Sequence, residues 1–116
     1  MGAFRILLGC IFLTIFAYTA VVIANHGMGL LPVFFGDMAK MAWPGQFNLD
    51  FAGFLILSGL WLAWRHQFSP AGIALGVLGL FGGAPVLAAY LFFASRQADG
   101  DWARLFLGEE RARSRA

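Results

Sequence analysis

The chain has 116 residues, of which 60% are hydrophobic and 12% charged, and its formal net charge is +2. A soluble domain carries about 25% charged residues, so this chain has about half the charge that a water-facing surface needs. The mean hydropathy of +0.76 agrees, and the basic clusters with exposed stacking aromatics that nucleic-acid binding needs are missing. We expect one all-α, multi-pass integral membrane protein whose main partner is the lipid bilayer.

The first apolar run, residues 4–24, is long enough to cross the hydrocarbon core of a bilayer. It is longer than the roughly 7–15 residues of a signal-peptide core, so we expect an uncleaved span. At 100° per residue, a weakly polar stripe follows one side of this helix: Cys10, Thr14, Tyr18, Val21 and Asn25. Polar side chains in lipid prefer to face another helix, so we expect this stripe to pack inward.

Residues 30–43 are too short and too broken to span. Pro32 and Gly36 interrupt them, and Asp37 and Lys40 lie opposite a broad apolar face. This pattern is typical of a helix that lies in the membrane interface. We therefore expect an interfacial amphipathic segment between the first two spans.

The second span is expected at residues 49–65. Asn48 is placed to cap its N-terminus, and Asp50 falls in the first turn, where the helix dipole favours an anion. Trp64 and Arg65 are typical of an interfacial anchor at the other end.

The third span is expected at residues 70–94, which completes a three-helix bundle in a transmembrane domain of residues 1–95. Small residues at helical spacing predict close helix packing in lipid, and here they are Gly72, Gly76, Gly79 and Gly83. Pro85 should bend this helix. Residues 96–116 form a polar, amphipathic tail, in which we expect a short interfacial helix.

Three crossings would put the N-terminus and the second loop on one side, with the first loop and the tail on the other. The first side carries two cationic residues, Arg5 and Arg65, and the second carries the remaining six of eight. By the positive-inside rule, this count places the tail in the cytoplasm of a bacterial inner membrane. An N-terminus inside is the alternative.

With this topology, six polar residues fall at one membrane face and form a candidate cluster: Asn25, His26, Asn48, Asp50, Tyr90 and Arg96. The simplest interpretation is a helix-start acid with a surface histidine and a capping asparagine. In the alternative, Asp50 pairs with Arg96 or bonds Tyr90 or His26 and ties the three helices together. A binding or proton-relay role would be a further step.

The sequence offers little support for catalysis or for a cofactor. No acid or base lies near the middle of any span, and the hydroxyl groups of Ser58 and Thr14 have no histidine within reach. One soft-metal set shares a face, namely His26, Met28, Met38 and Met41, but methionine is also an ordinary packing residue. We expect no enzyme activity, no metal and no cofactor.

The layout resembles small bacterial membrane proteins that are grouped as domains of unknown function. The shared features are the amphipathic connection at residues 34–38, Asp50 and Arg65 at the two ends of the second span, Gly82-Gly83-Ala84-Pro85 in the third, and then Tyr90 and Arg96. The resemblance implies the fold and brings no assigned activity.

Two functions stay open ahead of a third, a membrane-embedded redox subunit. The first is a non-enzymatic accessory or assembly subunit that packs through its glycine face, within the bundle or against a second copy or another membrane protein. The alternative is an oligomeric carrier of small solutes or ions, with Asp50 and His26 at its mouth.

Overall fold

The structure, a computed structural model, describes residues 1–115, and within that range it consists entirely of helices, turns and loops. The helices are α1 (Gly2–His26), α2 (Leu30–Ala39), α3 (Trp43–Arg65), α4 (Pro70–Ala98), α5 (Trp102–Leu107) and α6 (Glu109–Arg115). The all-α prediction is confirmed. Three of the helices, α1, α3 and α4, are long and apolar enough to cross a membrane.

The chain leaves α2 and enters α3 earlier than the sequence predicted. α3 begins at Trp43 instead of residue 49, with Pro44 in its first turn, where a missing N–H costs nothing. Asn48 therefore does not cap the helix, and Asp50 does not lie in its first turn. Gly45, in the first turn of α3, is buried against α2. A Cβ atom at this position would overlap the carbonyl oxygen of Asp37, so the close contact needs glycine.

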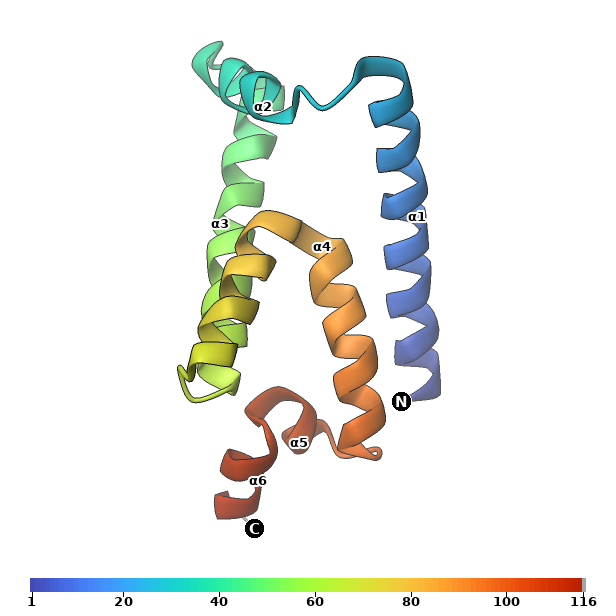
Figure 1. The fold of residues 1–116 in the computed structure, drawn as a ribbon, viewed down its shortest axis with the longest axis vertical. Helices are drawn as coiled ribbons and strands as arrows, with labels where there is room; N and C mark the ends of the chain where they lie inside the picture. Colours follow the sequence, from blue (N-terminus) through green and yellow to red (C-terminus); the bar gives the residue numbers. More distant parts are fainter. Residues whose placement is uncertain (116) are drawn as a thin grey trace.

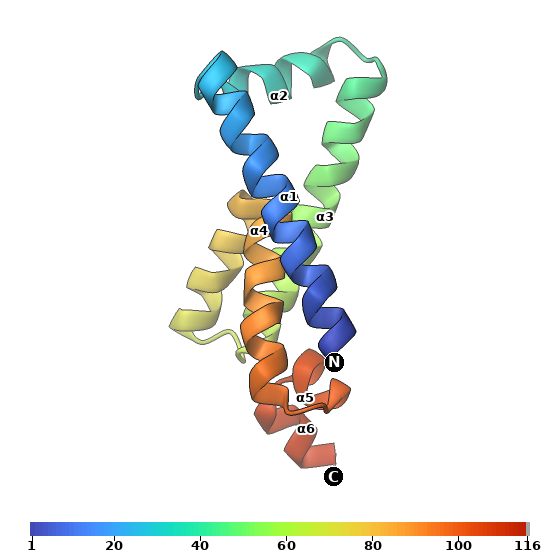
Figure 2. The same cartoon turned by 90° about the vertical axis from the view of Figure 1, so that its right-hand side faces the viewer.

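α4 is broken at Gly83, which has φ 67° and ψ −150°, a conformation that favours glycine. Pro85 follows, lacks an N–H and cannot continue the ladder of the preceding turn. The two arms, residues 70–82 and 84–98, form a hairpin whose second arm runs back beside the first (Figures 1 and 2). This hairpin stands in place of the expected single crossing by residues 70–94.

The fold-back changes which segments share an end of the molecule. We call the terminal end the one that holds residue 1, loop 66–69, α5 and α6, and the α2 end the opposite one (Figure 1). The tail was expected at the same end as the first loop; in the structure α4 returns it to the end that holds residue 1.

The first arm packs on α3 through glycine. A Cβ atom on Gly76 would lie 2.8 Å from the carbonyl oxygen of Gly59, and one on Gly59 would lie 2.8 Å from the carbonyl of Gly76. Glycine alone allows the two backbones to approach so closely. The whole predicted stripe is buried in this hairpin: Gly72, Gly76, Gly79 and Gly83.

The second arm packs on the half of α1 that is nearest the terminal end. Leu8 and Ala88 are both nearly fully buried, and Ala94, Ala98 and Leu105 form a small core there. The other half of α1 has no buried residue. The prediction for the weakly polar stripe of α1 is wrong for this chain, since all of its residues are exposed: Cys10, Thr14, Tyr18, Val21 and Asn25.

Candidate functional site

The six residues of the predicted polar cluster lie at two ends of the molecule. Asn25 and His26 end α1, and Asn48 and Asp50 lie near the start of α3, so these four belong to the α2 end. Tyr90 and Arg96 lie on the second arm of α4, which returns to the terminal end. The prediction grouped the six residues because it assumed that α4 runs straight across; the reversal of α4 places Tyr90 and Arg96 at the other end.

At the α2 end, one residue of the predicted cluster makes a defined side-chain bond. Nδ2 of Asn48 donates to the carbonyl oxygen of Phe34 at 3.1 Å and so joins α3 to α2. His26 and Asp50 are exposed, and the side chains of neither form a hydrogen bond or ion pair within residues 1–115. Both residues lie at the α2 end, where the oligomeric carrier of the alternative function would have its mouth.

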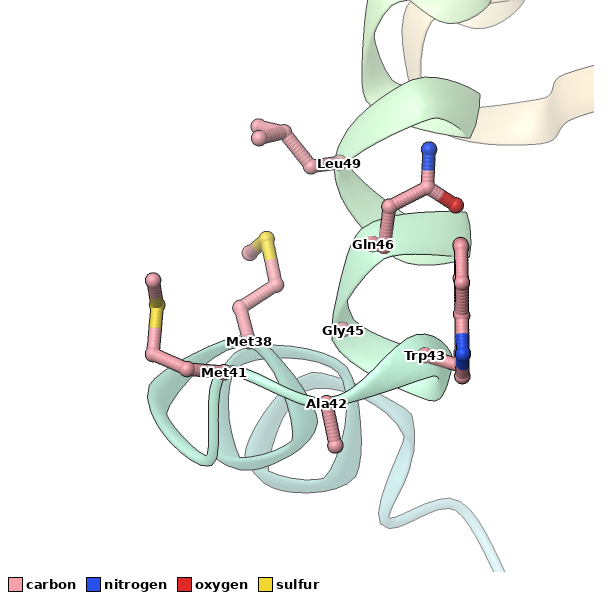
Figure 3. A pocket seen from close by; sticks show the side chains of 7 residues that line it. All are labelled: Met38, Met41, Ala42, Trp43, Gly45, Gln46 and Leu49. Atoms are coloured by element: carbon pink, nitrogen blue, oxygen red, sulfur yellow. The ribbon is translucent and has the colours of Figure 1, made fainter.

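A shallow pocket of about 570 Å³ lies at the same end, where α2 turns into α3. Figure 3 shows Met38 and Met41 extending beside α3 towards the level of Leu49, with Gln46 and Trp43 on another side of the helix. Two thioethers alone do not make a metal site, and residues 1–115 hold no group of three His, Cys, Asp or Glu side chains that could bind a metal. The pocket is a mostly apolar crevice between the end of α2 and the start of α3.

The denser polar arrangement lies at the terminal end, around Arg65. Its Nη1 donates to the Tyr90 hydroxyl at 2.7 Å, and Nε2 of His66 makes a short hydrogen bond with the same hydroxyl. Arg65 also lies 5.5 Å from the centre of the Tyr90 ring. We call Arg65, His66 and Tyr90 the α3–α4 polar triad.

The triad favours an uncharged His66. A guanidinium can only donate, so the Tyr90 oxygen accepts from Arg65. In its bond with His66, the Tyr90 hydroxyl either donates to Nε2 or accepts from a protonated Nε2, depending on the imidazole tautomer. Burial, followed by the charge of Arg65, lowers the pKa of His66 below its usual 6.5. The folded state therefore favours the neutral imidazole.

Arg65 also anchors the tail. Nε donates to the carbonyl oxygen of Leu105 at 2.7 Å, and Nη2 donates to that of Arg104 at 3.2 Å. These carbonyls belong to the C-terminal part of α5, which favours a cation; that of Arg104 also accepts from the backbone N–H of Gly108 at 3.1 Å. The contact holds α5 where Leu105 is fully buried in the small core with Ala94 and Ala98.

The tail in turn makes contacts with the end of α3. Arg111 of α6 donates to the carbonyl oxygen of Trp64 and stacks over its indole ring, 3.9 Å from the ring centre. Nε1 of Trp61 donates to the carbonyl oxygen of Phe106 at 3.1 Å. Each end of the α3–tail contact is thus closed by an arginine that caps the other helix.

Arg5 joins α1 to α4. Nε of Arg5 donates to the hydroxyl of Ser95 at 3.1 Å, and Nη2 reaches its carbonyl oxygen at 3.3 Å. Ser95 is fully buried and also donates to the carbonyl of Phe92 at 2.7 Å. Most of the polar side chains described here at the terminal end therefore form hydrogen bonds between helices.

Sequence reasoning assigned Arg65 and His66 to an ordinary interfacial anchor and missed the triad. The available signal was the pair Gly82-Gly83 directly before Ala84-Pro85, in which one residue frees the backbone and another blocks the helix. This pair permits a reversal as well as the bend that was expected.

No family model, curated protein or solved structure matches this chain.

Proposed function

We propose that the protein is a non-enzymatic integral membrane protein in which α1 and α3 cross the bilayer and α4 enters and leaves from the same side. At 1.5 Å per residue, α1 and α3 are about 37 and 34 Å long, against about 30 Å for the hydrocarbon core. Only 6% of the apolar window of α1 is buried within the chain. Lipid is the solvent that this surface suits.

A half-depth hairpin is consistent with the rules for backbone in lipid. Irregular backbone at membrane depth is tolerated where protein covers it. Gly83 is buried, and a Cβ there would lie 3.0 Å from the Phe51 ring and 3.7 Å from Leu55. The break in α4 is therefore covered by two α3 side chains.

We propose that both termini lie in the cytoplasm of a bacterial inner membrane. With the hairpin, the terminal end carries seven of the eight cationic residues, because only Lys40 belongs to the α2 end. The positive-inside rule places the more cationic side in the cytoplasm. A count of seven against one supports this orientation more strongly than the count of six against two for three crossings.

The role we propose is that of an accessory or assembly subunit. The glycine face of α4 is occupied by α3, so the face left for a second copy or another membrane protein is the unpacked half of α1. That half carries Thr14 and Tyr18, the latter 74% exposed. Polar side chains in lipid favour a helix partner, which supports an assembly role for this face.

Purification in mild detergent tests both parts of the proposal. We expect the protein to stay in the membrane after alkaline carbonate washing, and to elute in a complex larger than its 12.6 kDa chain. Tyr18→Ala should release the free chain, whereas Phe81→Ala, equally exposed but on the α4 hairpin, should not. Release by carbonate would contradict the membrane proposal. A free chain in the unaltered protein would contradict the assembly role.

The alternative, an oligomeric carrier with Asp50 and His26 at its mouth, has less support. From these two residues towards the terminal end, α1 has no acid or base until Arg5 and α3 has none until Arg65, so neither helix continues a polar path across the membrane.

A further inference from the structure

An apolar groove of about 580 Å³ runs between α3 and the second arm of α4. Its walls are apolar side chains of both helices, and Phe106 of α5 lines it at the terminal end. The main lining residues are Phe54, Leu55, Trp61, Leu87, Leu91 and Phe106.

The groove has the length of one leaflet. On α3 it extends from Phe51 to Trp61, which is ten steps of 1.5 Å, or about 15 Å. One leaflet of a bilayer contributes half of a hydrocarbon core of about 30 Å. Because α3 crosses the membrane in the proposed arrangement, the groove runs along the membrane normal, as lipid chains do.

The two ends of the groove match the depth of a lipid chain. At the hairpin tip, Gly83 and Ala84 line the groove. At the terminal end Phe106 lines it, and the carbonyl oxygen of Phe106 accepts a hydrogen bond from Trp61 Nε1 at 3.1 Å. Trp rings prefer the level of the headgroups, where a chain would leave the groove.

The lining chemistry favours an apolar occupant. Ser58 supplies the one hydroxyl in the lining; its oxygen is buried without a hydrogen-bond partner in the described residues and lies on the side of the first arm, 3.6 Å from where a Cβ of Gly79 would lie. The Trp61 N–H is already bonded.

We propose that this groove holds one acyl chain of a phospholipid from the leaflet at the terminal end. The inference rests on the proposed membrane arrangement. The lipid would fill the space beneath the hairpin that neither helix fills, and it would remain bound when bulk lipid is removed.

Native mass spectrometry from phosphatidylcholine nanodiscs tests the proposal. The unaltered protein should retain one lipid after detergent removal of bulk lipid. Leu87→Trp fills the groove and should lower the retained fraction about tenfold, which corresponds to roughly 1.4 kcal/mol of overpacking. Ile73→Trp, on the exposed face of the first arm, is the matched control and should retain lipid normally.

Equal retention in all three proteins would overturn the proposal. If Leu87→Trp loses its helical circular dichroism signal, Leu91→Trp replaces it as the test, because it fills the half of the groove that is nearer the terminal end. A chain that stays soluble without detergent would defeat the proposed function itself. A membrane-bound chain with equal lipid retention would defeat only this inference.

Discussion

The Tyr90 hydroxyl accepts a hydrogen bond from Nη1 of Arg65 at 2.7 Å, although 25 residues separate the two in sequence. Arg65 ends α3, and Tyr90 lies on the second arm of α4. A straight α4 would carry Tyr90 away from this end, so the bond depends on the reversal at Gly83. Arg65 also bonds the tail, and Tyr90 also bonds His66, so this one contact links the reversal of α4, the docking of the tail and the position of His66.

Removing the Tyr90 hydroxyl should destabilise the fold. Tyr90→Phe leaves one guanidinium donor and the Nε2 atom of His66 without their partner, and we expect a loss of about 1–2 kcal/mol. Thermal unfolding in detergent, followed by circular dichroism, measures it. Phe81→Leu, at an exposed position on the α4 hairpin, should leave the midpoint unchanged; an equal shift in both variants would contradict the role of the triad.

Arg65→Lys should loosen the tail. An ammonium keeps the charge but cannot reach the carbonyls of Arg104 and Leu105 together with Tyr90 in the fixed fork of a guanidinium. With about 2 kcal/mol of docking lost, the open form of the tail, and with it tryptic cleavage at Arg111, should rise roughly thirtyfold. Arg96→Lys, at an exposed position on α4, is the control. Unchanged cleavage in Arg65→Lys would refute the anchoring role.

Gly76→Ala should separate α3 from the first arm. The new methyl would lie 2.8 Å from the Gly59 carbonyl oxygen, a contact that backbone must relieve, at a cost of about 1–3 kcal/mol. Gly53→Ala meets nothing within 4 Å and should stabilise α3 by up to about 1 kcal/mol. Opposite signs in the two unfolding curves are expected. Two shifts of the same sign would contradict close packing at Gly76.

The stability should fall as the pH drops below about 6.5. Folding lowers the pKa of His66, so in the window between its folded pKa and 6.5 the unfolded chain binds more protons than the folded one. The stabilisation is therefore complete above this window and is lost as the pH falls through it. Unfolding midpoints measured across this range should lose much of their slope in His66→Gln but keep it in His26→Gln.

The sequence was sufficient for the helical class, for the long apolar helices and for an amphipathic connection. Composition and run length determine these features, and the apolar run of α1 has no competing interpretation. The buried set Gly72, Gly76, Gly79 and Gly83 was also visible as a pattern, since helical spacing alone aligns it.

The candidate site could not be read in the same way. Its position depends on one backbone conformation, that of Gly83, and the dipeptide that permits a reversal also permits a bend. The choice depends on long-range contacts such as Arg65–Tyr90 and Arg5–Ser95, which no local pattern encodes. Once α4 was carried straight across, Tyr90 and Arg96 were assigned to the wrong end.

The most direct test of the account is the side of the membrane on which the tail lies. In a Cys10→Ser background, single cysteines at Met28, Gln67 and Ser114 can be labelled with a membrane-impermeant maleimide in intact and in permeabilised cells. The hairpin predicts that the Met28→Cys protein is labelled in intact cells, and that the Gln67→Cys and Ser114→Cys proteins are labelled only after permeabilisation. Labelling of the Ser114→Cys protein together with the Met28→Cys protein, opposite to Gln67→Cys, would mean that α4 crosses the bilayer and would contradict the account.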